Sequence, residues 1–358
     1  MTLDAGGTSF RFSAMRGNKF VAPTVTMPSC ADNLDRCLGN VIDGFAVTRS
    51  KCPGDPVAIS FAFPGPADYP NGIIGDLPNL PAFRGGIALG PMLEEKFGIP
   101  TFINNDGDLF TYGEAIAGLL PYVNDLLEKA GSPKRYKNLF GVTLGTGFGG
   151  GIVRDGHLFV GDNSIAGEVW LLRNKLAPLM NAEEGACIRA VRRVYAAKAG
   201  IPFEQAPEPK VIAEIGLGTQ PGNREAALEA FRQMGEVAGD AMANALTLID
   251  GLAVVGGGLS GAWPLFLPPL VDELNSLYTG PNGNQFRRLA SRAFNLQEFD
   301  QLEKFIHGET REIKVPRSER LLKYDPAQRI GVGVSRLGTS VAISVGAYAF
   351  ALSALDKK

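Results

Sequence analysis

The sequence has few of the residues that most often build metal and redox sites. It contains only 2 histidines and 4 cysteines in 358 residues. The cysteines show neither the paired spacing of zinc sites nor the density of a disulfide scaffold. They are Cys30, Cys37, Cys52 and Cys187. Neither His157 nor His307 stands where a catalytic triad or a metal site would need it. Reduced thiols are the simplest interpretation, and they indicate a cytosolic protein.

Long apolar runs and long basic runs are also missing. The sequence has no stretch of about 18 apolar residues. Its start also lacks the charged segment followed by an apolar segment that marks a signal peptide. We therefore expect a cytoplasmic protein that does not enter a membrane. The net charge is −2, with 35 Lys and Arg against 37 Asp and Glu, which argues against nucleic acid or an anionic membrane as the main partner. The P-loop pattern Gly-x-x-x-x-Gly-Lys-Ser/Thr is absent.

The content that remains is that of a globular protein with two domains. Hydrophobic residues make up 45% of the chain, and domains usually hold about 100–200 residues. Two domains of that size can each bury a core, and a cleft between them is an ordinary place for a ligand site.

A short stretch around Asp106 carries the first sign of chemistry. An apolar strand entry leads into Asn105, Asp106 and Gly107. A carboxylate at a strand end can accept a proton from a substrate hydroxyl, while the Asn105 amide can hold that hydroxyl or its neighbour. A sugar kinase needs this arrangement. The alternative is a turn rich in Asn and Asp, since these residues gather where a chain bends.

The start of the chain predicts a phosphate-facing turn. Asp4 precedes Gly6, Gly7 and Thr8, and the alternating residues 10–15 read as the next strand. Glycines and a threonine let backbone N–H groups and a hydroxyl approach phosphate oxygens, with Asp4 facing the associated cation. A plain hairpin turn is the alternative. The strand before the turn is a stub, so we expect either a longer natural start or a frayed edge.

Two later glycine turns also follow strands. Gly145, Thr146 and Gly147 come after the strand expected at 139–144 and fit a second phosphate-facing turn. A glycine-rich hairpin would give the same pattern. Gly256, Gly257 and Gly258 follow the buried strand 252–255, and such a turn brings backbone close to a ligand such as a nucleotide base or ribose.

Polar residues in rigid loops complete the candidate set. Gly65 lies in the turn that stops the strand at 57–63, and prolines on both sides fix Asn79. A preset loop of this kind can hold one amide against a ligand hydroxyl, although a proline-braced surface loop is the alternative. Glu168 is a further carboxylate, for which a solvated side chain is the default interpretation.

Other stretches predict the scaffold. Apolar periodicity predicts helices, and two stretches show no regular pattern. The expected helices span 31–50, 90–98, 183–199, 224–249 and 340–355, while 119–138 reads as an exposed insertion and 282–335 as polar and irregular. Arg189, Arg192 and Arg193 read as a solvated helix face.

The ordered set of motifs resembles the ROK family of sugar kinases and regulators, within the actin-like ATPase superfamily. The matching residues span nearly the whole chain. They are Asp4-Ala5-Gly6-Gly7-Thr8 and Leu144 to Gly151 for phosphate, Phe63-Pro64-Gly65-Pro66 with Pro78-Asn79-Leu80-Pro81 for sugar, Asn105-Asp106 with Gly113-Glu114, and Val255-Gly256-Gly257-Gly258 for adenosine.

The resemblance implies an α/β fold of two ribonuclease-H-like lobes that bind ATP and sugar between them. Residues 1–118 would form one lobe and 119–358 the other, with the last helix, about 340–358, returning to the first lobe. Asp106 would take the proton from the sugar 6-hydroxyl. Asn79, Asn105, Glu168 and Gly65 would bind the sugar, and the glycine turns with Mg²⁺ near Asp4 would stabilise the transferring phosphoryl group. The resemblance also implies a homodimer.

The sequence departs from the family pattern after Glu168. Members commonly read Gly-Glu-x-Gly-His there, the His contacting sugar and zinc, but the His position is Leu171. The cysteine cluster that completes a zinc site is absent downstream, so we expect no structural zinc and one sugar contact fewer. No helix-turn-helix precedes Asp4, which disfavours the repressor branch.

The main hypothesis is therefore an ATP-dependent hexose kinase with Asp106 as base. A sugar-binding sensor with little kinase activity is the alternative, and a hydrolase or acetate-kinase-like enzyme of the same superfamily fits less well. The sequence leaves open which hexose is used, among glucose, mannose, fructose or an N-acetylated hexosamine, and whether ATP is the donor.

Overall fold

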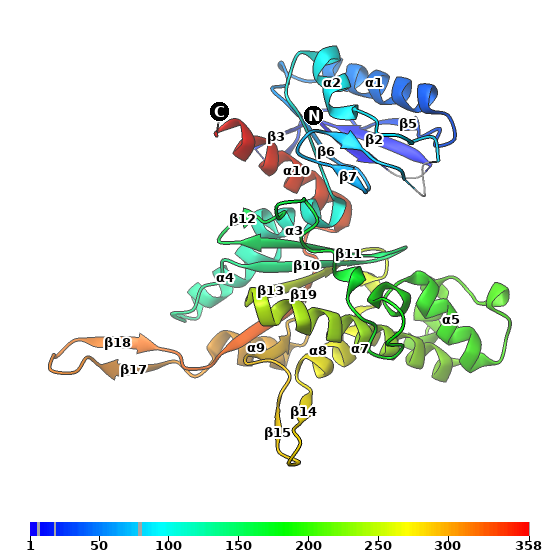
Figure 1. Ribbon diagram of the computed structural model, residues 1–358. Helices are drawn as coiled ribbons and strands as arrows, with labels where there is room; N and C mark the ends of the chain where they lie inside the picture. The colour runs from blue at the N-terminus through cyan, green and yellow to red at the C-terminus, as the bar shows by residue number, and fades with distance from the viewer. Residues whose placement is uncertain (6–7, 18, 78–80, 358) are drawn as a thin grey trace. The chain divides into compact units, whose positions relative to one another are not determined.

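The computed structural model describes residues 1–5, 8–17, 19–77 and 81–357, and it divides into two compact units (Figure 1). Unit 1 contains Met1–Ala117, His157–Ala166 and Leu337–Lys358. Unit 2 contains Gly118–Gly156 and Gly167–Arg336. The chain therefore passes between the units four times, and each unit has its own core.

Unit 1 is built on a sheet whose strands run both ways. The strands β5 (Val25–Pro28), β2 (Ser9–Ser13) and β1 (Thr2–Ala5) are antiparallel neighbours, and β6 (Ile59–Ala62) pairs in parallel with β9 (Thr101–Asn104). The nitrogen of Met1 donates to the carbonyl of Ala58 at 2.7 Å, and Ser60 donates to the carbonyl of Met1 at 2.9 Å, which joins β1 to β6. Because β1, β6 and β9 run the same way, their carboxyl ends meet at one edge.

Aromatic side chains fill the core of unit 1. Phe10 and Phe12 alternate with polar residues on β2 and are fully buried, as a strand with one face inward requires. Phe45 from α1 (Leu34–Ser50) lies edge-on to Phe12 at 5.0 Å and tilted against Phe61 at 5.8 Å. The apolar face of α1 therefore closes one side of the sheet that carries the strand ends.

Two helices of unit 1 pack closely through glycine. α3 (Asp106–Ala117) and α10 (Thr339–Leu355) approach so nearly that a Cβ atom at Gly113 would lie 1.9 Å from the carbonyl oxygen of Ala342. The shorter elements complete the unit. They are β3 (Met15–Arg16), β4 (Lys19–Phe20), β7 (Ala67–Asp68), β8 (Ile73–Ile74), α2 (Leu89–Phe97) and β12 (His157–Leu158).

Unit 2 is built around a mostly parallel sheet. Five of its strands lie in the order β11 (Phe148–Arg154), β10 (Leu139–Leu144), β13 (Leu252–Gly256), β19 (Arg329–Val334) and β16 (Arg292–Asn295). The pair β10–β11 is antiparallel, and the pairs β10–β13, β13–β19 and β19–β16 are parallel. β12 follows β11 after the turn at Asp155–Gly156.

Helices surround this sheet. α7 (Arg224–Ile249) buries Phe231, Met234 and Met242, spaced as on one face of a helix. The others are α4 (Leu119–Lys129), α5 (Ile188–Ala199), α6 (Pro209–Leu217), α8 (Trp263–Leu274) and α9 (Phe299–His307), with 3₁₀ turns at 169–171, 182–185, 203–205 and 260–262. Two hairpins, β14 (Leu277–Thr279) with β15 (Gln285–Arg287) and β17 (Arg311–Lys314) with β18 (Leu321–Tyr324), project from the body of unit 2 (Figure 1).

Most expected elements are confirmed, and two are wrong. The helix expected at 224–249 has those bounds, and the strands expected near 57–63, 139–144 and 252–255 are present. The stretch 119–138 is not an exposed insertion, because α4 buries Leu119, Val123 and Leu127. The stretch 282–335 is not irregular, because it contains β19, a buried strand between β13 and β16.

Among the described residues, no helix is both long enough and apolar enough to cross a bilayer.

Candidate active site

Unit 1 gathers several candidate residues at one edge of its sheet. Asp4 lies on β1, one residue before that strand ends, while Gly65 follows β6 and Asp106 follows β9. Ala62 and Asn104 are partners in the β6–β9 register, and Phe63 donates to the carbonyl of Asn104 at 3.0 Å. The loops after these two strands therefore start side by side, at the edge where α/β sheets bind ligands.

Asp106 occupies the first position of α3. The amide of Gly107 donates to Asp106 Oδ1 at 2.9 Å and to Asn105 Oδ1 at 2.7 Å. Asn105 therefore closes the helix start in the manner of a capping residue, and its NH₂ group is the part of the side chain left for a ligand. The positive end of the helix dipole faces both side chains and favours an anion there.

The environment of Asp106 suits a general base. The residue keeps an exposed surface, yet surrounding protein atoms displace water from the carboxylate and raise the pKa of Asp106 above its ordinary value, an effect that the Gly107 hydrogen bond opposes. Desolvation is the larger influence, so the pKa is raised on balance. A carboxylate that is reachable and has a raised pKa accepts a proton more readily than an ordinary aspartate.

The first phosphate-facing turn is only partly described. Asp4 is half-buried and faces Arg11 in the β1–β2 register, while Thr8 is exposed. The carbonyl of Thr8 accepts a hydrogen bond from Ser29 at 3.1 Å, which anchors the far side of the turn. Gly6, Gly7 and Asn79 lie outside the described residues, so their roles remain predictions.

Unit 2 brings its two glycine turns together. β10 and β13 are parallel neighbours with Thr143 opposite Gly256, so the turns at 145–147 and 256–258 leave the same sheet edge. Leu259 donates to the carbonyl of Leu144 at 3.0 Å, and Ile188 donates to that of Gly145 at 2.8 Å. The backbone at this edge is thus fixed from both sides, as a rigid phosphate and nucleotide cradle requires.

Two residues for which the sequence predicted no role at the site contact the second turn expected to face phosphate. Glu183 accepts a hydrogen bond from the amide of Phe148 at 3.0 Å. Arg189 donates to the carbonyl of exposed Thr146 at 3.2 Å and pairs with Glu183 at 3.2 Å. Arg189 lies on an exposed helix face, as expected, and it also contacts this turn. Only chain folding joins these residues to the turn, and no local signal in the sequence identifies them.

Glu168 lies in unit 2, after the glycine turn that packs on β11. Its carboxylate accepts a hydrogen bond from the indole N–H of Trp170, so one oxygen already has a partner. Leu171, at the position where the resemblance implies a His, is 60% exposed. The surface beside Glu168 is therefore apolar at Leu171, and the Trp170 indole hydrogen-bonds to the glutamate.

The glutamate of the Gly113-Glu114 pair has a structural position instead. It is fully buried and accepts a hydrogen bond from the amide of Leu337 at 3.1 Å. Leu337 lies two residues before the first residue of α10, so Glu114 helps to fix the start of that helix. The motif therefore positions α3, which carries Asp106 at its other end.

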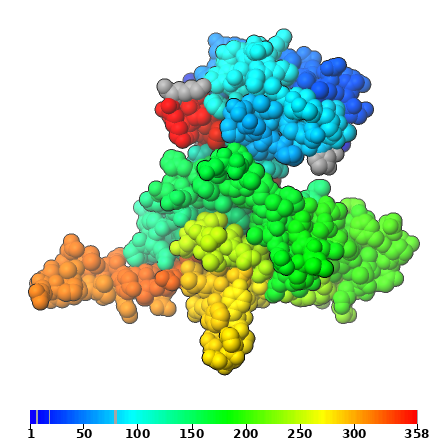
Figure 2. All heavy atoms as spheres, viewed as in Figure 1, coloured from blue at the N-terminus to red at the C-terminus, as the bar shows by residue number. Residues whose placement is uncertain are grey.

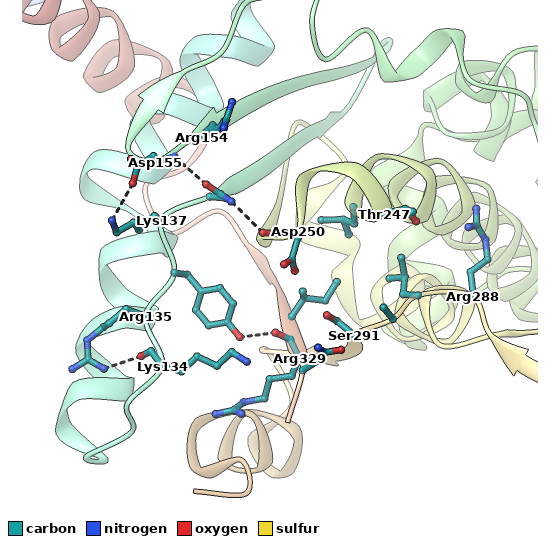
Figure 3. A pocket seen from close by; sticks show the side chains of 17 residues that line it. Lys134, Arg135, Lys137, Arg154, Asp155, Thr247, Asp250, Arg288, Ser291 and Arg329 are labelled. Atoms are coloured by element: carbon teal, nitrogen blue, oxygen red, sulfur yellow. Dashed lines mark hydrogen bonds and ion pairs between the residues drawn. The ribbon is translucent and has the colours of Figure 1, made fainter. Parts of the chain in front are cut away.

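A cavity is found elsewhere in unit 2. It has a volume of about 890 Å³ and lies at the amino ends of β10, β13 and β19, opposite the glycine turns (Figure 3). Six bases line it, but most have partners within the protein: Lys137 pairs with Asp155 at 3.1 Å, and Arg288 pairs with Asp240 at 3.1 Å. Size alone therefore does not make it the active site, and none of the predicted site residues lines it.

Metal binding was assessed from the donor groups. Among the described residues, no group of three or more His, Cys, Asp and Glu side chains is placed to hold a metal ion. Magnesium commonly uses only one or two carboxylates together with phosphate oxygens and water. A single carboxylate at Asp4, before the turn expected to bind phosphate, fits that requirement.

Comparisons with known proteins agree with the fold and the motifs. The sequence profile described as the ROK family matches residues 1–295. A crystal structure of glucokinase from Parabacteroides distasonis is 56% identical with a TM-score of 0.90, covering 98% of this chain and 96% of that one. The N-acetyl-D-glucosamine kinase of Photobacterium profundum is 29% identical over 72% of this chain and 83% of its own.

A third comparison concerns the fold alone. A ROK family glucokinase from Streptomyces griseus, solved with glucose and AMPPNP, has a TM-score of 0.61 at 18% identity, with 97% of each chain covered. The expected two-lobed α/β fold of the actin-like ATPase type is confirmed by these structural neighbours.

Proposed function

This chain belongs to the ROK family, and we propose that it is an ATP-dependent hexose kinase in which Asp106 is the general base. The observation that carries this proposal is the position of Asp106, exposed at the start of α3 with a raised pKa. The 56% identity to a protein described as a glucokinase makes glucose the first sugar to test, with N-acetyl-D-glucosamine second.

The proposed chemistry starts at the carboxylate of Asp106. A carboxylate oxygen of Asp106 accepts the proton of the sugar 6-hydroxyl as that oxygen attacks the terminal phosphoryl group of ATP. The NH₂ group of Asn105 orients a neighbouring hydroxyl, with Glu168, Asn79 and Gly65 proposed as further sugar contacts. General base catalysis of this kind contributes a factor of about 10²–10⁴ in rate.

Phosphate binding is assigned to the glycine turns. The backbone N–H groups of 145–147 and of 6–8 would face the phosphates, and the turn at 256–258 would lie along the nucleoside. Glu183 and Arg189 keep the 145–147 turn in place before ATP arrives, so the donors need little reorganisation. Bound Mg²⁺, held in part by Asp4, would neutralise charge on the transferring phosphoryl group. We further propose that the enzyme works in the cytoplasm as a homodimer.

The deciding experiment is an ADP-release assay over a panel of hexoses with Mg-ATP. It compares the wild type with Asp106→Asn and with the control Asp125→Asn, which removes an exposed carboxylate on α4. We expect sugar-dependent turnover that falls by about two orders of magnitude or more in Asp106→Asn and is unchanged in the control. Folded protein whose turnover no sugar stimulates would overturn the proposal.

One observation favours a second candidate, a sugar-binding protein with weak kinase activity. The Glu168 carboxylate is engaged by Trp170, and exposed Leu171 offers no polar contact. If this candidate is right, calorimetry will show that the wild type binds a sugar. Its rate of ADP release will then be no higher than that of the Asp106→Asn variant.

A further inference from the structure

The hairpin formed by β17 and β18 has only two strands, and one of its faces exposes apolar side chains. All eight residues of the two strands are exposed, and the hairpin extends away from the rest of unit 2 (Figures 1 and 2). Ile313, Leu322 and Tyr324 share one face, with exposed fractions of 40%, 42% and 43%. An isolated pair of strands is only marginally stable in water, so this face is suited to a partner.

The opposite face of the hairpin carries charge. Glu312 and Lys314 flank Ile313 on β17. Lys323 lies across from Glu312, and Leu321 lies across from Lys314. Lys314 also forms an ion pair with Glu319 at 2.7 Å, but Glu319 is 94% exposed. The ammonium group has three donors and can serve a second carboxylate.

One edge of β17 is open. Within the part of the chain that the structure describes, β17 pairs with β18 alone. Val315 donates to the carbonyl of Arg320 at 2.9 Å. This hydrogen bond shows which residues of the strand direct their backbone groups toward β18, because the direction alternates from residue to residue. The backbone groups of Val315, Ile313 and Arg311 therefore face β18, while those of Glu312 and Lys314 face outward. Unpaired outward groups of this kind are a template for another strand.

We propose that the open edge of β17 binds the same edge of a second copy of this chain, antiparallel and centred on Ile313. In that register Glu312 faces the partner's Lys314 on the charged face, and Lys314 faces the partner's Glu312. The backbone groups of Glu312 and Lys314 point outward, so these two residues would form the hydrogen bonds across the contact.

The apolar face becomes continuous in the same register. Leu322, Ile313, the partner's Ile313 and the partner's Leu322 form one row across four strands. Cross-strand pairs of this kind stabilise antiparallel sheets.

Other symmetric registers along this edge are disfavoured by charge. An arrangement centred on Arg311, Glu312 or Lys314 would place that residue directly opposite its own copy, and like charges directly opposite one another destabilise a sheet. Ile313 is the one position of β17 at which self-pairing faces no like charges. This contact involves only the hairpin, so it is independent of the proposed kinase activity.

A cysteine cross-link tests the contact directly. In the proposed register Ile313 would form a pair without hydrogen bonds to itself, with Cα atoms about 4.5 Å apart. A disulfide accepts Cα separations of about 4.4–6.8 Å. We expect the full-length Ile313→Cys variant to form a covalent dimer under mild oxidation at least ten times faster than Leu321→Cys. Leu321 is 56% exposed on β18, away from the open edge, and the wild type supplies the baseline for the native thiols.

Charge reversal then tests the register. In the Ile313→Cys background, Glu312→Lys should slow cross-linking at least fivefold, because it places lysine opposite lysine, and adding Lys314→Glu should restore the rate. Equal rates for Ile313→Cys and Leu321→Cys would overturn the proposal. So would a double charge reversal that stays as slow as the single one, provided that thermal unfolding shows both variants folded.

Discussion

A Cβ atom at Gly257 would lie 2.3 Å from the carbonyl oxygen of Leu144. The φ angle of Gly257 is +88°, a value that side-chain-bearing residues rarely adopt. The end of β10 and the turn after β13 are therefore in direct backbone contact. Two loops that the sequence places more than a hundred residues apart form one rigid surface at the sheet edge.

This contact predicts the effect of a single methyl group. Gly257→Ala is expected to destabilise unit 2 by about 1–3 kcal/mol and to raise the KM for ATP more than the KM for sugar, because it displaces the Leu144 carbonyl. Gly258→Ala is the control, since a Cβ atom there meets nothing within 4 Å. Thermal unfolding and steady-state kinetics measure both effects. Equal behaviour of the two variants would show that the backbone contact is not needed.

A second prediction concerns the carboxylate that holds the 145–147 turn. Hydrogen bonds to charged groups contribute about 1.5–3 kcal/mol, so Glu183→Ala is expected to raise the KM for ATP about tenfold or more, leaving the KM for sugar within about twofold. Glu184→Ala is the matched control, because Glu184 contacts the side chains of Arg189 and Arg193 and does not reach the amide of Phe148. A comparable loss in Glu184→Ala would mean that overall charge, and not the turn, is responsible.

The sequence predicted those parts of the site that follow strands. Apolar runs ending in Gly, Asn or Asp are local patterns, and the structure has strands that end just before Asn105 and Gly145. Helix α7 was equally predictable, because its apolar residues keep a helical spacing over 26 residues. Where a pattern is continuous and local, the secondary structure is determined by neighbouring residues, so it can be inferred from the sequence.

The sequence did not predict features that depend on distant contacts. Glu183 reaches the Phe148 amide across 35 positions, and no periodicity indicates that pairing. β19 was missed because its glycines, Gly331 and Gly333, lower its strand signal; they are required because Leu296 and Leu119 pack directly on them. The start of helix α3 at Asp106 was not predicted, because the residue that caps it is Asn105. An asparagine is as common in turns as at helix caps.

A third prediction separates activity from stability at Asp106. The folded pKa of this carboxyl is raised, so the folded state binds its proton more tightly than the unfolded chain does. The charge therefore destabilises the fold above the folded pKa, and this effect disappears as pH falls below it. Asp106→Asn is expected to have a Tm at pH 7 equal to or above that of the wild type, with the difference shrinking in acid. A lower Tm at pH 7 would contradict this.

The same pKa shift predicts the pH dependence of catalysis. A general base must be deprotonated, so kcat/KM is expected to fall as pH decreases through the pKa of Asp106, starting at a higher pH than for an ordinary aspartate near 3.9. The measurement is kcat/KM against pH with saturating Mg-ATP, and enzyme stability is checked at each pH by returning samples to neutral buffer. An acidic limb at or below the ordinary aspartate value would assign the base to another group.

The last prediction concerns how α3 is held. At Gly113 a Cβ atom would lie 1.9 Å from the carbonyl oxygen of Ala342, whereas at Gly39, also within a helix, it meets nothing within 4 Å. Ala is favoured over Gly in a helix interior by about 0.5–1 kcal/mol, so Gly39→Ala is expected to raise the Tm. Gly113→Ala must instead push α10 from α3 and should lower the Tm by several degrees. Because α3 begins at Asp106, it should also lower kcat. An increase in Tm for both variants would show that the helices separate without cost.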